Sequence, residues 1–177
     1  MPSIPSVSIR RATSLDEEGI LRCLQAAFAP YQHLYTASAF DDTVLTPQLL
    51  VQRLRTMSVF VAEISSGQIV GTVACGLLSR DEGHLRGMGV LPEWQGRGVA
   101  KQLLDGAEAE LRASGCKRVT LDTTEPLVPA MHFYERNGFR RTGKISDFFS
   151  MPLIEYAKEI SDSASLKPLL PVRPALR

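Results

Sequence analysis

The sequence of residues 90–100 is VLPEWQGRGVA, and this stretch decides how the rest of the chain is interpreted. It lies between a strand-like run, residues 84–90, and an amphipathic helical run, residues 98–113. Gly96 and Gly98 have no Cβ, so the backbone can turn tightly and approach a ligand closely. The first amides of the helix have no partner within it and lie at the positive end of its dipole. The stretch therefore predicts a site for a phosphate or a pyrophosphate.

Two common phosphate-binding motifs do not fit this loop. A P-loop ends in Gly-Lys-Ser/Thr, whereas here Gly98 is followed by Val99 and Ala100. The dinucleotide fingerprint GxGxxG requires a third glycine, and Lys101 occupies that place. Arg97 offers a charged donor to a phosphate oxygen. A plain tight turn is the alternative interpretation of the two glycines taken alone.

A second segment, residues 130–139, has the sequence AMHFYERNGF and follows a strand-like run at residues 116–123. It contains most of a short helix expected over residues 129–136, which ends near Asn137 and Gly138. Taken alone, Tyr134 in this helix is a buried aromatic residue whose hydroxyl meets a backbone group.

Together the two segments resemble the GNAT superfamily of acyl-CoA N-acyltransferases. Residues 95–100, QGRGVA, resemble its pattern Gln/Arg-x-x-Gly-x-Gly/Ala, and residues 130–139 resemble its pattern Ala-x-x-x-Tyr-x-x-x-Gly-Phe at the same spacing. The resemblance extends over about residues 7–158, and its specific motifs lie within residues 84–139. It implies an acetyltransferase that uses acetyl-CoA as co-substrate, needs no metal, and acetylates a primary amine of an acceptor.

The resemblance also implies roles for individual residues. Loop amides are expected to bind the CoA pyrophosphate, and the end of the preceding strand is expected to pair with the pantetheine arm. The residues implied in this way are Met88, Gly89, Val90, Gln95, Gly96, Arg97, Gly98, Val99, Ala100 and Lys101. Tyr134 is implied as general acid, because the departing CoA thiolate needs a proton that a phenol with a pKa of about 10 can give. A backbone amide near the end of the strand is expected to stabilise the oxyanion formed when an amine attacks the thioester.

The general base is where the chain departs from the family. Many members carry a carboxylate on the fourth strand, and here Arg86 occupies that position, although a guanidinium cannot accept a proton. His84 is in phase with Arg86 on an alternating strand and has an ordinary pKa of about 6.5. Glu82, Asp122, Glu125 and a water chain are the alternatives. Arg86 itself is a candidate for binding a carboxylate of the substrate. The missing carboxylate also favours an alternative function, a non-catalytic acyl-CoA-binding module on the same fold.

The resemblance implies an acceptor pocket built from residues 28–46 and 144–152, which are the least patterned parts of the chain. Candidates that favour a cationic amine through aromatic and carboxylate contacts are Tyr31, Tyr35, Phe40, Asp41 and Asp42. A solvated loop is the simpler interpretation of the same residues. Phe148 and Met151 are candidates for contacts with the substrate, with core packing as the alternative. A small metabolite, an antibiotic, a peptide N-terminus and a protein lysine all stay open as acceptors.

The hydrophobic pattern predicts one α/β (α+β) domain over residues 1–160, with a mixed, mostly antiparallel sheet flanked by helices, followed by a polar and Pro-rich tail, residues 161–177. The expected order is β-α-α-β-β-β-α-β-α-β-β. The expected strands are 7–11, 58–64, 69–78, 84–90, 116–123, 139–145 and 149–158. The expected helices are one that begins at a capping box, Ser14 to Glu17, and ends at Pro30, one that begins at Thr46-Pro47, and those at 98–113 and 129–136. Residues 31–46 are expected to be irregular.

Composition narrows the class further. The net charge of the 177 residues is +1, which argues against a basic nucleic-acid-binding surface. No run approaches the roughly 20 apolar residues of a membrane span, and residues 1–11 do not resemble a secretory signal. Cys23, Cys75 and Cys116 have no CxxC spacing, so neither a disulfide framework nor a zinc site is expected, and the simplest compartment is the reducing cytoplasm. A homodimer formed through apolar residues of the tail is an open alternative.

Overall fold

The computed structural model describes residues 5–160, which form a seven-stranded sheet with five α-helices. The strands are β1 (Val7–Arg11), β2 (Ser58–Ile64), β3 (Ile69–Leu77), β4 (Glu82–Val90), β5 (Arg118–Thr124), β6 (Arg140–Phe148) and β7 (Met151–Glu159). The helices are α1 (Glu17–Phe28), α2 (Ala37–Val44), α3 (Pro47–Thr56), α4 (Val99–Ala113) and α5 (Val128–Arg136). The sheet order is β1-β2-β3-β4-β5-β7-β6, and among these pairs only β4 and β5 are parallel. The predicted mixed, mostly antiparallel α/β fold is therefore confirmed.

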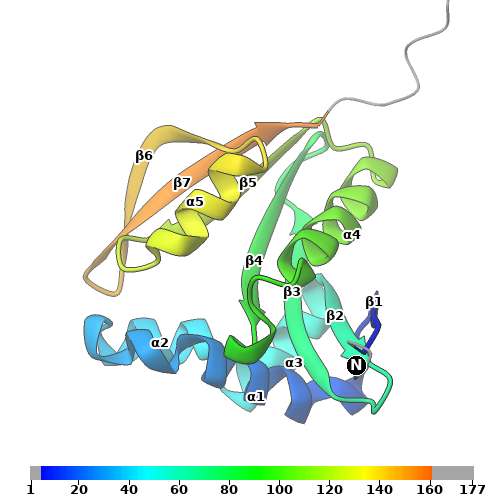
Figure 1. Ribbon diagram of the computed structural model, residues 1–177. Coiled ribbons are helices and arrows are strands. Elements are labelled where there is room, and N and C mark those ends of the chain that lie inside the picture. Colours follow the sequence, from blue (N-terminus) through cyan, green and yellow to red (C-terminus); the bar gives the residue numbers. More distant parts are fainter. Residues whose placement is uncertain (1–4, 161–177) are drawn as a thin grey trace, which may run out of the picture.

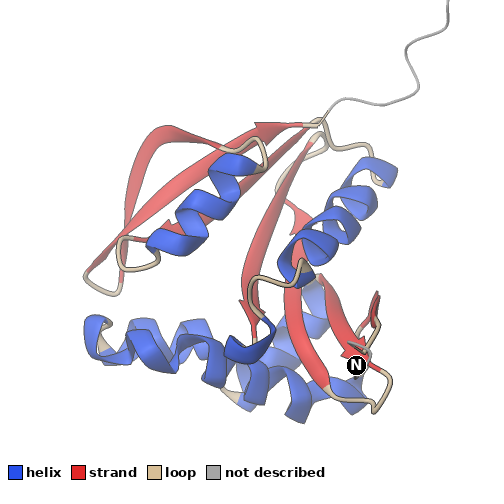
Figure 2. Cartoon of the chain, viewed as in Figure 1, coloured by secondary structure: helices blue, strands red, loops and turns tan. Residues whose placement is uncertain are grey.

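Helices cover both faces of the sheet around β3 and β4. Figure 1 shows β4 running through the middle of the molecule, with α4 on one side of it and α5 on the other. Helices α1, α2 and α3 lie together at the bottom of the same view (Figure 2). A β-carbon placed on Gly83 would lie 2.6 Å from Leu111 of α4, whereas one on Gly89 would lie 3.0 Å from Leu24 of α1. The central strands are therefore packed tightly between α4 and α1, and the core lies in these two layers.

The β4 strand contains a bulge that changes which face its residues meet. Thr72 of β3 pairs with Gly89, and Ala74 pairs with Arg86, so β4 has two residues where β3 has one. One of the two is Gly87, whose φ of 62° lies in the left-handed region that glycine adopts without strain. The extra residue moves Gly89 to the face opposite to that expected from simple alternation with Gly83.

The parallel pair β4–β5 separates before either strand ends. The last paired residues are Leu85 and Leu121. From residue 86 of β4 and residue 122 of β5 onward, the two strands make no ladder with each other, so the sheet opens towards their carboxyl ends. Backbone groups on this side of β4 are therefore left available to an extended ligand.

Residues 31–46 were predicted to be irregular, and this prediction was wrong. They contain α2 and most of a 3-10 turn, Ala29–Leu34. Thr36 caps α2, since its hydroxyl accepts the amide of Ala39 at 3.3 Å, and Phe40 and Val44 are buried in the core. The helix has only about two turns, which is too short for an apolar periodicity to stand out in the sequence.

The predicted capping box at Ser14 and Glu17 was also wrong, by one residue. The cap is Thr13, whose hydroxyl accepts the amide of Leu15 at 3.3 Å, while the carboxylate of Asp16 accepts the amide of Thr13 at 2.7 Å. A short 3-10 turn therefore precedes α1.

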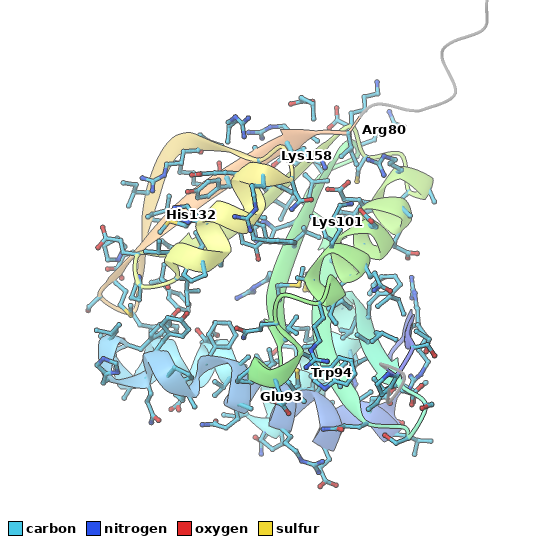
Figure 3. All side chains as sticks on the ribbon, in the orientation of Figure 1. Arg80, Glu93, Trp94, Lys101, His132 and Lys158 are labelled. Carbon is cyan, nitrogen blue, oxygen red and sulfur yellow. The ribbon has the colours of Figure 1, made fainter. Side chains whose placement is uncertain are left out.

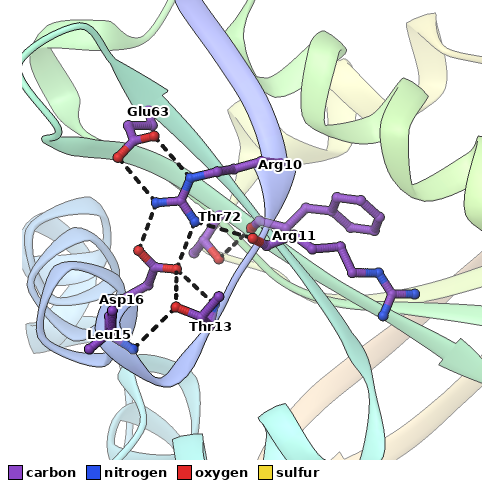
Figure 4. Close-up of polar contacts among 8 residues, drawn as sticks. Arg10, Arg11, Thr13, Leu15, Asp16, Glu63 and Thr72 are labelled. Atoms are coloured by element: carbon purple, nitrogen blue, oxygen red, sulfur yellow. Dashed lines mark hydrogen bonds and ion pairs between the residues drawn. The ribbon is translucent and has the colours of Figure 1, made fainter.

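An arginine from β1 explains this choice of cap. The guanidinium of Arg10 donates two hydrogen bonds of 2.8 Å to Asp16 and a further one of 2.9 Å to Glu63 of β2 (Figure 4). Asp16 thus joins the beginning of α1 to the edge of the sheet, which a glutamate at residue 17 does not do. The arginine pulls the pKa of Asp16 down to about 2.

Other local predictions are confirmed. Helix α1 ends at Phe28, just before Pro30, and Thr46 caps α3 with Pro47 in the first turn. Gly115 follows α4 with a φ of 90°. The last strand begins at residue 151 rather than 149, because residues 149 and 150 have positive φ angles and form the turn.

Cys23, Cys75 and Cys116 are all buried as free thiols. Within residues 5–160, no helix is both long and apolar enough to cross a membrane. The tail, residues 161–177, lies outside the described residues, so its separation from a single domain stays a prediction, and so does a homodimer.

Candidate active site

A cavity of about 1000 Å³ lies where β4 and β5 separate. Its size is at the upper end of the range of about 300–1,000 Å³ seen for ligand sites. One arm reaches the beginning of α4, with Gly96, Gly98 and Lys101 in its wall. The other arm reaches the far side of β4, where Arg53 and Gly76 line it. A single cavity therefore connects the loop before α4 with the face of β4 that α1 and α3 cover.

The loop before α4 has the open geometry expected of an anion site. Gly96 and Gly98 have φ angles of 73° and 81°, and a β-carbon on either would meet no atom within 4 Å. Gly98 is the N-cap of α4 and provides no side chain to satisfy the first amides. These amides therefore stay available to a ligand at the positive end of a helix of about four turns.

The remaining loop residues hold the turn in place. The side-chain amide of Gln95 donates to the carbonyl of Val90 at 3.0 Å and so closes the loop onto the end of β4. Trp94 is buried, and the guanidinium of Arg97 lies 5.2 Å from the centroid of its ring. Lys101 forms an ion pair with Asp105 one turn further along α4. Trp94 and Lys101 are labelled in Figure 3.

Nearly all of the residues predicted to bind the co-substrate lie in the cavity wall. These are Met88, Gly89, Val90, Gln95, Gly96, Gly98, Val99, Ala100 and Lys101. Arg97 is not in the wall, since its guanidinium stacks on Trp94. Its predicted contact with a phosphate stays a prediction that would need this side chain to leave the ring.

Tyr134 lies on α5 with its side chain directed into the same cavity. The residue is 8 % exposed and packs edge-on between Phe133 and Phe139, with ring centroids 5.4 and 5.8 Å away. Within residues 5–160, its hydroxyl has no hydrogen-bond partner. Burial raises the pKa of Tyr134, so the phenol keeps its proton at neutral pH. The hydroxyl is therefore a free donor that lines the cavity.

His84 and Asp122 meet across the parallel pair. The Nδ1 atom of His84 is 2.8 Å from Oγ1 of Thr120, and its Nε2 atom is 3.5 Å from Oδ2 of Asp122. Burial lowers the pKa of His84 and raises that of Asp122, while the mutual attraction of the pair acts in the opposite sense on each. Both side chains line the cavity, whereas Glu82 and Glu125 do not. Of the four side chains considered as general base, the structure thus brings two together in the site.

Only some of the residues proposed to contact the acceptor line the cavity. Tyr31, Tyr35 and Asp42 line the cavity, whereas Phe40 packs in the core and Asp41 is exposed outside the cavity. Asp42 is 3.4 Å from Arg86, so its charge is already shared with a cation. Phe148 lines the cavity and Met151 is buried elsewhere.

Two residues of the cavity region, Arg53 and Thr120, could not be recognised from the sequence, and a third, Thr123, has a buried polar group there. Arg53 of α3 lies in the cavity wall, but the sequence around it resembles a solvent-exposed face of a helix. Thr120 orients His84, which only the register of β4 against β5 reveals. Thr123 has a buried hydroxyl that lacks a hydrogen-bond partner within residues 5–160 and belongs to the cavity wall. An unpaired buried hydroxyl of this kind is consistent with a polar ligand.

Metal ligation finds no support in the described part of the chain. Among residues 5–160, no group of three or more His, Cys, Asp and Glu side chains is arranged to hold an ion.

Comparison with solved structures gives the same fold. An acetyltransferase of Staphylococcus aureus Mu50 superposes with a TM-score of 0.73 at 17 % identity, over 88 % of this chain and 100 % of that one. The PaiA N-acetyltransferase of Thermoplasma acidophilum, solved with coenzyme A, has a TM-score of 0.73 at 18 % identity, over 88 % and 99 % of the two chains. An Elizabethkingia anophelis acetyltransferase solved with acetyl-CoA bound has a TM-score of 0.61 at 15 % identity, over 87 % and 98 %.

The family itself is established by sequence. The family model described as the acetyltransferase (GNAT) family matches residues 20–139, which is more than half of the chain. The matched region contains most of α1, the β4–β5 opening, the loop before α4 and Tyr134. The chain therefore belongs to the GNAT acetyltransferase family.

Proposed function

We propose that this chain is an N-acetyltransferase that transfers the acetyl group of acetyl-CoA to a primary amine. The observation that carries the proposal is the single cavity that joins the open amides of α4 to Tyr134 and to the His84–Asp122 pair. Binding of coenzyme A and of acetyl-CoA by two structural neighbours supports the choice of co-substrate.

The residues present fit acetyl-CoA. The open space before Gly96 and Gly98 suits a pyrophosphate, which the amides of residues 98–101 would bind. The unpaired side of β4 at residues 88–90 suits the amides of the pantetheine arm, as an added strand would. The unpartnered hydroxyl of Thr123 offers a further hydrogen bond inside the cavity.

When bound, acetyl-CoA supplies an acyl thioester that an uncharged amine can attack. His84 and Asp122 take the proton from the incoming ammonium group. The hydroxyl of Thr120 donates to the carbonyl of Gly83 at 3.4 Å, so it accepts the Nδ1 proton of His84 and leaves Nε2 unprotonated. The lone pair of Nε2 and the carboxylate of Asp122 then hold one proton between them.

Two further groups stabilise the negative charge that develops on the CoA sulfur and on the carbonyl oxygen. The phenol of Tyr134 is protonated at neutral pH and gives a hydrogen bond or its proton to the sulfur as the negative charge develops there. Backbone amides at the bulge of β4, residues 87–89, lie in the cavity wall and are the donors we assign to the developing negative charge on oxygen.

The test is calorimetric titration of acetyl-CoA into the wild type and into Gly98→Glu. We expect micromolar binding that is lost in the variant, because the new carboxylate lies where the pyrophosphate binds. Gly115→Glu is the matched control, since Gly115 also has a positive φ and open space around it but lies outside the cavity. Failure of the folded wild type to bind acetyl-CoA would remove the proposal. Binding without release of CoA in the presence of any amine would favour the non-catalytic module.

A further inference from the structure

The side chain of Arg53 has no direct counterion among residues 5–160, and the charge of Asp42 acts on it only from a distance. It projects from α3 towards the bulge of β4, where a β-carbon on Gly87 would lie 2.5 Å from its Nη1 atom. Within residues 5–160, it forms no hydrogen bond and no ion pair. Burial and the nearby charge of Arg86 lower the pKa of Arg53 to about 10, while the charge of Asp42 acts in the opposite sense. A mostly buried guanidinium in this state is costly, and an anion bound in the cavity would relieve the cost.

The other charges at this arm of the cavity are already balanced. Arg86 lies 3.4 Å from Asp42, and Lys144 lies 3.4 Å from Glu155. Each of these two cations thus has a carboxylate partner, and the third carboxylate near this part of the cavity, Asp122, lies 3.5 Å from His84. Arg53 is left over, and the fork of Arg86 is only partly used, because its contact with Asp42 is one long hydrogen bond.

This arm is separate from the pyrophosphate loop. A β-carbon on Gly83 would face α4, so alternation turns His84 and Arg86 to the opposite face of β4. The loop amides and Lys101 belong to the end of the cavity at α4. An anion bound by the arginines is therefore not a phosphate of the co-substrate.

The spacing along β4 limits the size of the acceptor. His84 and Arg86 are two residues apart on one face of a strand, which corresponds to about 7 Å. An amine that gives its proton to the His84–Asp122 pair and an anion that meets Arg86 and Arg53 are therefore separated by only a few bonds. A small amino carboxylate meets this requirement, whereas the amine of a protein lysine has no anionic group at that distance.

We infer that the acceptor is a small amine that carries a carboxylate, and that Arg53 and Arg86 together bind this carboxylate and select for it. The inference rests on the proposed acetyl transfer and names its acceptor class. The planar guanidinium groups match a carboxylate through paired hydrogen bonds. Asp42 orients Arg86 until the acceptor arrives.

The test compares matched pairs of amines as acceptors for acetyl-CoA, and the rate is measured from the release of the CoA thiol. Each pair is an α-, β- or γ-amino acid and the amide of the same compound, which lacks only the negative charge. We expect the wild type to prefer the carboxylates by about tenfold or more in kcat/KM, as a charge-assisted hydrogen bond implies. Arg53→Ala and Arg86→Ala should raise KM for the carboxylates by a similar factor and leave the amides unaffected. Arg53→Lys should recover part of the preference.

Two controls separate this inference from the proposed function. Arg55→Ala removes an exposed arginine of the same helix that is not in the cavity wall, and it should keep the preference intact. Calorimetric titration of acetyl-CoA into each variant should give an unchanged Kd, which also reports correct folding. The inference is overturned if acetyl-CoA binds but carboxylates are used no better than their amides, including the case in which neither is used. It is equally overturned if Arg53→Ala retains the wild-type preference.

Discussion

The Nε2 atom of His84 lies 3.5 Å from Oδ2 of Asp122, and the two side chains come from neighbouring parallel strands. Burial opposes the charged form of both, since it lowers the pKa of the imidazole and raises that of the carboxyl. Burial therefore favours states in which the imidazole of His84 and the carboxyl of Asp122 carry little net charge, with one proton shared between them. We propose that this pair takes the role of the carboxylate that the family resemblance led us to expect at Arg86, with the two acceptors supplied from β4 and β5.

The fall of kcat/KM at acidic pH, the acidic limb of the rate profile, should report the protonation of the His84–Asp122 pair. His84 must be unprotonated to accept a proton, and its pKa lies below its ordinary value of about 6.5. We expect kcat/KM to be full above that value and to fall as the pH drops through the lowered pKa. Asp122→Asn removes the charge that raises the pKa of His84, so the limb should move to lower pH. The measurement is kcat/KM from about pH 5 to about pH 9.

A control and a contrary result accompany this experiment. Glu125→Gln removes a carboxylate that does not line the cavity, so its profile should match the wild type. His84→Gln should lose the limb together with most of the rate, by about 100-fold or more. An unchanged limb in His84→Gln would assign the base to another group.

Tyr134→Phe should separate catalysis from stability. The hydroxyl has no protein partner within residues 5–160, so its removal should change Tm little. We expect kcat to fall by about 100-fold or more while the Kd for acetyl-CoA is kept. Tyr156→Phe is the opposite case, because its hydroxyl bonds Arg141 and Glu135 at 3.0 and 3.1 Å, so it should lower Tm and spare kcat. Equal kcat values in Tyr134→Phe and the wild type would exclude the phenol as the acid.

Local chemistry explains which parts of the molecule were predictable. The loop at residues 95–100 and the segment around Tyr134 are short, so their function depends on residues that are close in the sequence. The hairpin between β2 and β3 and the caps at Thr46 and Gly115 follow from turn and capping preferences of single residues. The hairpin and the two caps were confirmed because no distant contact had to be known.

Tertiary contacts explain the rest. The cap of the first helix moved to Thr13 because Arg10 holds Asp16 from another strand. The pairing of His84 with Asp122 depends on the register of β4 against β5, which alternation within one strand does not reveal. Arg53 became a site residue only because α3 packs beside the bulge at residue 87.

The buried carboxylate of Glu108 gives a stability prediction away from the site. Its side chain is 4 % exposed and accepts from Lys158 at 2.8 Å and from Arg112 at 3.2 Å. Lys158→Met leaves this buried charge with one partner, and we expect the free energy of unfolding to fall by about 2–3 kcal/mol. Urea denaturation measures the change. Arg22→Met, which breaks an exposed pair, should cost less than about 0.5 kcal/mol, and equal losses in the two variants would contradict the account.

The ion pair that fixes the first helix should make the protein acid-sensitive (Figure 4). Arg10 lowers the pKa of Asp16 from its ordinary value of about 3.9 to about 2. A depressed pKa means that the carboxylate stabilises the fold above about pH 4, and that this contribution is lost as the pH falls towards 2. Asp16→Asn keeps an acceptor for the amide of Thr13 but removes the charge, so it should cost about 1–2 kcal/mol at neutral pH.

Urea unfolding of the wild type and Asp16→Asn between about pH 2 and about pH 7 tests this linkage. We expect the two stability curves to be parallel above about pH 5 and to converge near pH 2, because protonation of Asp16 in the wild type then produces the same uncharged side chain. Asp41→Asn, which removes an exposed carboxylate outside this cluster, should leave the acid limb in place. Curves of wild type and Asp16→Asn that stay equally far apart down to pH 2 would show that the charge on Asp16 contributes nothing, and that the cap acts through its hydrogen bonds alone.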